Sequence, residues 1–268
     1  MWKLTSEFCP KNAKYAAELS KAVYDDNIVC DAFFEDNDTD TQAAGIVGPG
    51  SITIVFRGTE SIQDWLQDAK FRKEKFEIPK STVSNTSVFT RGESTHWNWG
   101  RVHRGFLASI DSVWPQIREF LRQKYTGQAI FLCGHSLGAA LAQLLAAWLS
   151  ANGYNVKAVY TFGSPRVGNR KFARMFDQKV RHYRFVNNND VVTRVPGFLY
   201  RHTGVEYYFN AKGFLDVLSF FALWIDRLRG RWYSLKARFR NVFKATDGIE
   251  DHMSARYVEN VDLIWGRG

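Results

Sequence analysis

The chain has 268 residues, of which 45% are hydrophobic and 24% are charged. These proportions are ordinary for a globular protein, so they exclude a disordered tail, a collagen and a small disulfide-stapled domain. The 36 lysines and arginines outnumber the 27 acidic residues and give a net charge of +9. A basic balance of this kind favours an anionic partner, such as nucleic acid, anionic lipid or an acidic substrate.

Turn signals and short apolar runs alternate in the N-terminal half of the chain. The predicted elements are, in order, an amphipathic helix over 11–24, an acidic solvated turn over 31–40, a hairpin of strands over 43–47 and 51–56, a strand over 69–78, a loop over 79–100, and a helix over 106–125 that is interrupted or kinked near Pro115. The first helix places five apolar residues on one face, which we expect to be buried: Tyr15, Ala16, Leu19, Ala22 and Val23.

Strand and helix patterns alternate more regularly in the C-terminal half. The predicted elements are a strand over 129–133, a buried helix over 137–149, a strand over 156–162, a helix over 169–176 and strands over 181–186 and 203–209. This alternation predicts parallel strands joined by crossover helices. Because there is no internal repeat and no low-complexity linker, we predict a single α/β domain over 1–268, with a basic helical insertion at about 211–245.

The pentapeptide Gly134-His135-Ser136-Leu137-Gly138 matches the pattern G-x-S-x-G. A buried strand precedes it and a helix rich in small residues follows it, which is the strand–turn–helix frame of a nucleophile elbow. The strained turn projects the serine hydroxyl above the sheet, and Gly134 and Gly138 give it room. A glycine-flanked serine that only caps a helix would show a similar motif, but both flanks favour the elbow.

A serine nucleophile needs a base and an acid that orients the base. In proteins with this elbow the acid and then the histidine follow the serine along the chain. Asp190 follows a predicted strand and is favoured over Asp177, which lies at a helix end. For the base, His252 is favoured over His202, whose alternative is a structural histidine next to a strand.

Several motifs, taken together and in order, resemble those of the lipase class 3 family of fungal-type triacylglycerol lipases. They are Asp40-Thr41-Gln42-Ala43, Val55-Phe56-Arg57-Gly58-Thr59, Val102-His103-Arg104-Gly105-Phe106, the elbow, the stretch from Tyr160-Thr161-Phe162-Gly163 to Gly168, Arg184-Phe185-Val186 running to Asp190, Tyr200-Arg201-His202-Thr203-Gly204, and Asp251-His252. The resemblance implies an α/β-hydrolase fold with a central, mostly parallel sheet flanked by helices and a short helical lid.

The same resemblance implies roles for individual residues. Ser136 would be the nucleophile, Asp190 the acid and His252 the base, which agrees with the choice made from chain order. Thr59 would contribute to the oxyanion hole together with the backbone N–H of Leu137.

In the resembled family, the segment after the oxyanion residue forms the lid. Here Ile62, Trp65 and Leu66 fall on one apolar face of a short helix. We expect this face to cover the serine or to contact substrate. An ordinary surface helix packed on the body would show the same spacing.

Residues 212–244 contain eight basic and two acidic residues, so the segment carries +6 of the total +9. It combines an apolar first half with a basic amphipathic second half, which is typical of a membrane-surface element. A helical pair packed on the body is the alternative. No nucleic-acid-binding motif accompanies the charge, so we expect no nucleic-acid partner.

The chemistry implied by these residues requires no metal or cofactor. The cysteines and histidines show no zinc spacing. Asp36, Asp38 and Asp40 resemble the start of a calcium loop, but Thr41 and Val47 stand where such a loop needs Gly and Glu. We therefore expect no metal site.

The N-terminal residues show no signal-peptide pattern, and no apolar run approaches the roughly 20 residues of a spanning helix. The odd number of cysteines favours reduced thiols, with a Cys9–Cys30 disulfide as the alternative. These observations favour a cytoplasmic or leaderlessly exported protein that is peripheral to membranes at most.

The resulting hypothesis is a serine carboxylic-ester hydrolase that acts on lipid esters at an oil–water or membrane interface, first of all a triacylglycerol lipase. The alternatives on the same scaffold are a phospholipase A1 and a short-chain esterase. An alternative of another class is a catalytically silent membrane-binding module, against which the intact set of Ser136, Asp190 and His252 argues.

Overall fold

The computed structural model describes the chain over residues 7–25, 28–59, 72–79, 96–197, 199–210, 213, 215–216 and 251–265. Within these residues, eight strands form the central sheet in the order β1-β2-β3-β6-β7-β8-β9-β10. They are β1 (Ala32–Asp36), β2 (Thr41–Gly48), β3 (Ser51–Phe56), β6 (Ala129–His135), β7 (Val156–Phe162), β8 (His182–Asn187), β9 (Val205–Phe209) and β10 (Leu215–Asp216).

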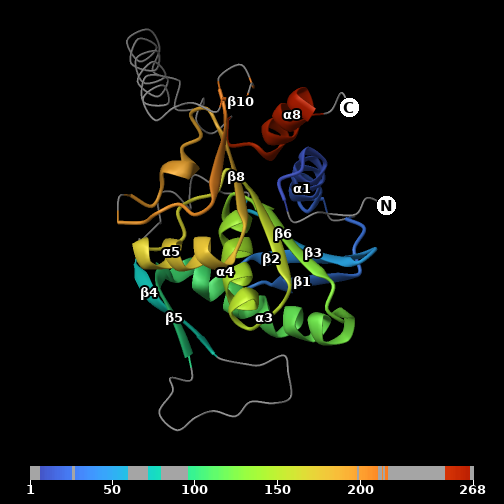
Figure 1. Cartoon of the computed structure of the whole chain (residues 1–268), viewed down its shortest axis with the longest axis vertical. Helices are drawn as coiled ribbons and strands as arrows, with labels where there is room; N and C mark the ends of the chain where they lie inside the picture. The colour runs from blue at the N-terminus through green and yellow to red at the C-terminus, as the bar shows by residue number, and fades with distance from the viewer. Residues whose placement is uncertain are drawn as a thin grey trace.

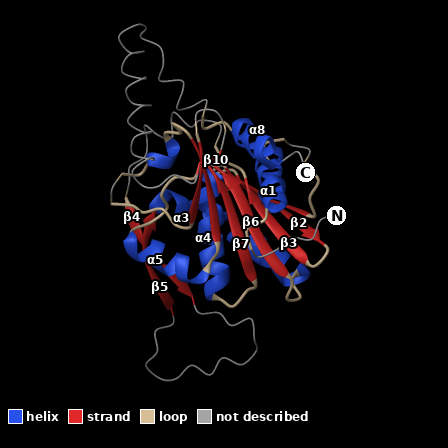
Figure 2. Ribbon diagram, turned by 45° about the horizontal axis from the view of Figure 1, so that its top comes forward, coloured by secondary structure: helices blue, strands red, loops and turns tan. Residues whose placement is uncertain are grey.

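The five neighbouring strands from β3 to β9 run parallel, and β1, β2 and β10 pair antiparallel at the edges. Parallel neighbours need crossover connections, which helices supply. Helices α3 (Arg104–Lys124), α4 (Leu137–Ala151) and α5 (Arg170–Lys179) lie on one face of the sheet, and α1 (Pro10–Ala22) and α8 (Ser254–Trp265) pack together on the other (Figure 1, Figure 2). The mostly parallel sheet between helices is therefore confirmed.

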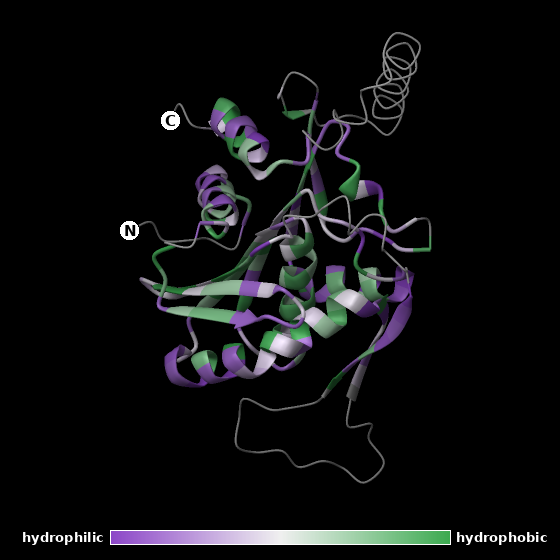
Figure 3. Ribbon diagram, turned by 180° about the vertical axis from the view of Figure 1, so that it is seen from behind, coloured by the Kyte–Doolittle hydropathy of each residue, from purple (hydrophilic) through white to green (hydrophobic). Residues whose placement is uncertain are grey.

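Two apolar clusters fill the spaces on either side of the sheet. In β6, Ile130 and Leu132 belong to the cluster beneath α3, α4 and α5, whereas Phe131 and Cys133 belong to the cluster beneath α1 and α8. This alternation follows from the two-residue period of a strand. Because helices cover both faces of the sheet, β6 is apolar almost throughout. Helix α3 lies on the outside of the molecule, and hydrophobic and hydrophilic residues alternate along it (Figure 3).

Three predicted elements differ from the structure. The acidic stretch over 31–40 contains strand β1 before its turn, because Phe34 is buried against α3. The predicted loop over 79–100 ends in strand β5 (His96–His103), which pairs with β4 (Lys73–Pro79) and buries Trp99. The helix predicted over 106–125 is α3, and it continues through Pro115 without interruption.

The buried face predicted for the first helix is also wrong in part. Helix α1 packs on the sheet through its small residues Ala13, Ala16, Ala17 and Ser20, and Tyr15 and Leu19 are only half-buried. Small side chains allow the helix to approach the strands closely. Helix α8 was not predicted, and it supplies the other half of this layer through Tyr257 and Val261.

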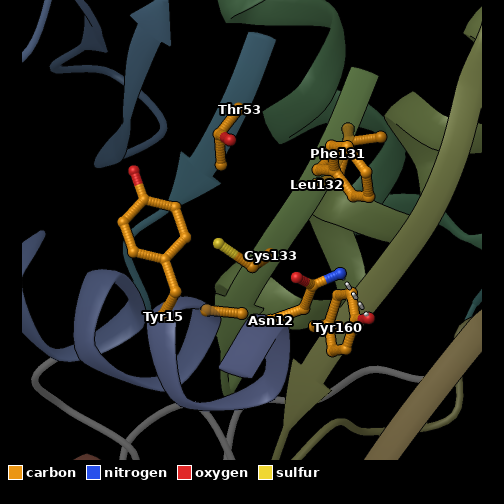
Figure 4. A pocket seen from close by; sticks show the side chains of 8 residues that line it. Asn12, Tyr15, Thr53, Phe131, Leu132, Cys133 and Tyr160 are labelled. Atoms are coloured by element: carbon orange, nitrogen blue, oxygen red, sulfur yellow. Dashed lines mark hydrogen bonds between the residues drawn. The ribbon is translucent and has the colours of Figure 1, made fainter. Parts of the chain in front are cut away.

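Beneath α1, a small cavity separates the helix from β6 and β7 (Figure 4). Asn12, Tyr15, Cys133 and Tyr160 are among its lining residues, and Asn12 donates to the Tyr160 hydroxyl at 3.4 Å. Burial raises the pKa of the Cys133 thiol to about 12. All three cysteines are unpaired.

Among the residues described, none of the helices has both the length and the apolarity needed to cross a bilayer.

Candidate active site

The elbow is the turn between β6, which ends at His135, and α4, which begins at Leu137. Ser136 stands between them with φ 57° and ψ −126°. A non-glycine residue in the positive-φ region is strained, and such strain persists only where the surroundings enforce it. The predicted elbow conformation is therefore present in the structure.

The two glycines of the elbow are required by close backbone packing. A Cβ atom on Gly134 would lie 2.5 Å from the carbonyl carbon of Gly138, and one on Gly138 would lie 2.2 Å from the carbonyl oxygen of Phe56. Neither position can accept a side chain unless main chain moves. The elbow thus packs directly against the end of β3. In the parallel pairing of β3 and β6, Phe56 lies opposite Gly134.

Thr59 follows the end of β3, and its segment lies directly beside the elbow. A Cβ atom on Gly58 would lie 2.8 Å from the carbonyl oxygen of His135 and 3.1 Å from Cβ of Ser136. The backbone of this segment and the first turn of α4, where Leu137 lies, therefore flank the serine. The N-terminus of a helix carries a partial positive charge, which favours an anion at this position.

Asp190 and His252 form a buried pair with no exposed surface on either side chain. Asp190 follows β8 and His252 precedes α8. Nδ1 of His252 lies 2.8 and 2.9 Å from the two carboxylate oxygens of Asp190. The carboxylate also accepts from the Tyr257 hydroxyl at 2.6 Å and from the Val192 backbone N–H at 2.9 Å.

These donors decide the protonation of the pair. Burial alone would raise the pKa of the Asp190 carboxyl, but His252 and the Tyr257 hydroxyl outweigh it and hold this pKa below its ordinary value. Burial and the neighbouring carboxylate raise the pKa of Tyr257 well above its usual range. Because an ionised carboxylate only accepts, the proton of His252 resides on Nδ1 and its Nε2 is left as the acceptor.

Nε2 of His252 is buried and has no hydrogen-bond partner within the described part of the chain. A buried imidazole nitrogen without a partner is rare and requires an explanation, of which a catalytic role is one. Its neighbour across the site is the elbow.

Gly163 brings the elbow and the Asp190–His252 pair together. Ser136 donates its backbone N–H to the carbonyl of Phe162 at 3.0 Å, and Gly163 is the next residue. At φ +59°, a Cβ atom on Gly163 would lie 2.8 Å from both Asp190 Oδ2 and His252 Nδ1. The structure therefore gathers all three predicted residues at the carboxyl ends of β6, β7 and β8.

A polar network of neighbouring side chains and backbone groups supports Asp190 and His252. Oδ2 of Asp251 accepts from the Asn188 side chain and from the Asn189 backbone, both at 3.1 Å. The Asn187 side chain donates to the Asp251 carbonyl at 2.9 Å, and its backbone N–H donates to the Tyr257 hydroxyl at 3.0 Å. Sequence reasoning missed Tyr257 and the support from Asp251. The run of three asparagines before Asp190 was a signal, but nothing in one sequence pairs it with residues more than sixty positions away.

The alternative base and acid, His202 and Asp177, have other hydrogen-bond partners, and so does the nearby His182. Nε2 of His202 donates to the Thr193 carbonyl at 2.7 Å. His182 bridges the hydroxyls of Thr161 and Thr203 at 2.7 and 2.8 Å, and burial lowers its pKa to about 3. Asp177 accepts from the Gly204 backbone.

The remaining predictions fall on other parts of the chain. The lid residues Ile62, Trp65 and Leu66 and most of the segment 212–244 lie outside the described residues. In the portion that the structure describes, no three His, Cys, Asp or Glu side chains gather in a way that could hold a metal ion.

Known proteins share this sequence pattern. A secreted mono- and diacylglycerol lipase of Fusarium solani is 36% identical over 140 residues, which cover 46% of this chain and 42% of the relative. A chloroplastic phospholipase A(1), DAD1 of Arabidopsis thaliana, is 30% identical over 178 residues, which cover 59% of this chain and 36% of the relative. The chain thus spans about half or less of the length of these curated relatives.

Solved structures share the fold. The native Rhizomucor miehei lipase–propeptide complex superposes with a TM-score of 0.58 at 28% identity, covering 76% of this chain and 70% of that chain. A triacylglycerol lipase whose catalytic centre is described as a serine protease triad gives a TM-score of 0.57 at 27% identity, covering 74% and 79%. These neighbours confirm the α/β-hydrolase fold. The family model for lipase (class 3) matches residues 53–200, more than half of the chain. The chain belongs to the class 3 lipase family.

Proposed function

We propose that this protein is a serine hydrolase of lipid carboxylic esters, with triacylglycerols as its principal substrates and Ser136, Asp190 and His252 as its catalytic triad. One observation carries the proposal. The buried, unpartnered Nε2 of His252 lies on a ring whose other nitrogen is held by an ionised carboxylate, beside a serine in strained backbone. A base in this state is ready to take a hydroxyl proton.

The proposed reaction uses these three groups in turn. Oγ of Ser136 attacks the ester carbonyl carbon while Nε2 of His252 takes its proton, and the Asp190 carboxylate stabilises the resulting imidazolium. His252 then returns that proton to the departing alcohol, which leaves an acyl ester on Ser136. Water, deprotonated by the same nitrogen, attacks this ester and releases the fatty acid.

We place the oxyanion hole at the backbone N–H of Leu137 and at Thr59. Leu137 begins α4, so its N–H lies at the positive end of the helix. A Cβ atom on Gly58 would lie 3.1 Å from Cβ of Ser136, and this close approach supports a position of Thr59 near the serine. Donors held in this way cost no reorganisation when negative charge develops, and removing one costs about 10²–10³ in kcat in comparable sites.

The substrate class rests on the relatives. A lipase that acts on mono- and diacylglycerols shares 36% identity with this chain, and the solved neighbours include a triacylglycerol lipase. Phospholipase A1 activity is the second candidate, because the phospholipase A(1) of Arabidopsis thaliana is 30% identical over 178 residues. A lid built on Ile62, Trp65 and Leu66, and a membrane contact through 212–244, complete the proposal for an enzyme that works at a lipid surface.

Replacing Ser136 by Ala tests the mechanism. We expect the variant to stay folded and to lose several orders of magnitude in turnover of a chromogenic fatty-acyl ester. A fluorophosphonate probe should label the wild type at Ser136 and should not label the variant. Turnover near that of the wild type would rule out the triad, and absence of labelling in the wild type would favour a silent module.

A panel of substrates then separates the lipid classes. Initial rates are compared on a triacylglycerol emulsion, phospholipid vesicles and a short soluble ester, with the Ser136→Ala protein as the blank. A rise in rate above the solubility limit of the substrate supports a lidded lipase. A preference for vesicles would favour phospholipase A1, and a preference for the soluble ester would favour an esterase.

A further inference from the structure

His135, the residue before the elbow serine, is buried and joins two other segments of the site. Its Nε2 contacts the backbone carbonyl oxygen of His252, and its Nδ1 lies 2.9 Å from the hydroxyl of Tyr24. The rings of His135 and His252 pack against each other in a tilted arrangement, with centroids 4.5 Å apart and planes inclined by 34°. The side chain therefore holds the main chain of His252 from the elbow side.

The direction of both hydrogen bonds follows from the acceptor at one end. A carbonyl oxygen only accepts, so Nε2 of His135 carries the proton. A neutral imidazole has a single N–H, so Nδ1 is the acceptor and the Tyr24 hydroxyl donates to it. Burial, and next the neighbouring side chain of His252, lower the pKa of His135 to about 3, so the ring is neutral around pH 7.

Tyr24 is itself held where it can perform this task. It follows helix α1, and its backbone N–H donates to the Lys21 carbonyl at 3.1 Å. The Arg57 guanidinium lies 5.5 Å from the ring centroid and donates to the Gln42 side chain at 2.8 Å. The hydroxyl packs so tightly on Gly58 that a Cβ atom there would lie 2.2 Å from it.

We infer that Tyr24 and His135 form a positioning pair, in which the His252 carbonyl sets the Nε2–H tautomer of His135, the Tyr24 hydroxyl supports it by donating to Nδ1, and the His135 N–H fixes the backbone of His252. This inference rests on the proposed function, because it assumes that His252 is the base. His252 is thus held from two sides: its ring is oriented by Asp190, and its main chain is tied to the elbow that carries Ser136. Neither Tyr24 nor His135 touches the reacting atoms.

The direct test is kinetic. With a soluble chromogenic ester, we expect His135→Phe to lower kcat on the order of 10- to 100-fold with KM little changed, because displacing a catalytic group by about 1 Å costs about that much. His135→Gln, whose amide N–H can replace Nε2–H, should recover part of this loss. Tyr24→Phe should lower kcat less, by about 3- to 10-fold, since the N–H on Nε2 survives in part of the molecules.

The matched control is Tyr160→Phe, which removes a buried tyrosine hydroxyl away from the Asp190–His252 pair and should leave kcat unchanged. If Ser136→Ala is inactive while His135→Phe keeps the kcat of the wild type, the positioning role is overturned and the triad stands. If Ser136→Ala is as active as the wild type, the triad itself fails.

A measurement on the unmutated protein avoids any defect in folding. The ¹⁵N and ¹H shifts of a histidine distinguish its tautomers, and His135 should appear as the Nε2–H form at pH 7. In Tyr24→Phe a fraction of the Nδ1–H form should appear. Detection of the Nδ1–H or the doubly protonated form in the wild type would overturn the inference.

Discussion

The two halves of the candidate active site are built by different physical means. The elbow consists of contiguous residues between β6 and α4, and its shape depends on side chains that are missing at Gly134 and Gly138. The proposed acid and base, Asp190 and His252, lie on two segments, 187–190 and 251–257, which hydrogen bonds join across more than sixty positions of sequence.

This difference determines what each half tolerates. At Gly134 and Gly138 backbone packs directly on backbone, so these two elbow positions are sensitive to side-chain volume. The acid–base half is a buried polar network, in which one missing partner leaves a group unsatisfied. A substitution that changes only side-chain volume should therefore affect the elbow most. A substitution that removes only a polar group should affect the Asp190–His252 half most.

The largest effect is expected for Gly138→Ala. The new methyl group would lie 2.2 Å from the Phe56 carbonyl oxygen and 2.8 Å from that of Arg57, both of them backbone atoms in the sheet. Because the sheet would have to move, we expect a loss of more than about 4 kcal/mol or no folded protein at all. Thermal unfolding and soluble yield measure this effect.

Gly197→Ala is the matched control, because a Cβ atom at Gly197 meets nothing within 4 Å. It should change the free energy of unfolding by less than about 0.5 kcal/mol. If Gly138→Ala unfolds at the temperature of the wild type, the elbow does not depend on close backbone packing.

The same contrast explains how far the sequence alone could predict this site. The elbow is a local pattern, so the residues on both sides of Ser136 predict its strand, turn and helix within two or three positions. Asp190 and His252 could be chosen by chain order, and the structure brings them together. The support from Tyr257 and Asp251 could not be predicted, because one sequence does not show which distant polar groups meet.

For the fold, the errors share a cause. Strands β6 and β7 are largely apolar because both faces of the sheet are covered, and they were predicted correctly. Strand β5 was missed because its burial does not alternate: Trp97 is 44% exposed although Trp99, two positions on, is buried. The register of its pairing with β4 shifts in this region, which interrupts the two-residue period. Helix α8 was missed although its buried residues, Tyr257, Asn260 and Val261, follow the i, i+3, i+4 spacing of one helix face. Three buried positions, one of them polar, are too few to mark a helix in the sequence.

Tyr257→Phe tests the polar half by removing one oxygen with almost no change in volume. The Asp190 carboxylate would lose its donor at 2.6 Å, and the Asn187 backbone N–H would lose its acceptor. We expect a loss of about 2–3 kcal/mol in the free energy of unfolding. We also expect kcat to fall on the order of 10-fold with KM little changed, because the carboxylate that orients His252 is less firmly held.

Urea unfolding and steady-state kinetics on a soluble ester measure the two effects. Tyr160→Phe is again the control, since its hydroxyl contacts Asn12 at 3.4 Å and no residue of the pair. It should cost less than about 1 kcal/mol and leave kcat unchanged. Wild-type stability and kcat in Tyr257→Phe would show that the polar half does not depend on this hydroxyl.

His135 is where the two halves meet, and it gives the smallest predicted effect, a dependence of stability on pH. Its pKa is about 3 in the folded protein, mainly because of burial, against about 6.5 in the unfolded chain. Between these values the unfolded chain binds one more proton, so stability falls as the pH falls, by up to about 1.4 kcal/mol per pH unit. Asp111 and Asp177, whose pKa values burial raises, oppose this trend in the whole protein.

The difference between the wild type and His135→Gln isolates the contribution of His135. Urea unfolding at pH 7 and pH 5 should show a smaller loss of unfolding free energy in the variant than in the wild type. Equal losses would mean that the folded protein lets His135 bind a proton, which would contradict its role as a neutral donor to the backbone of His252.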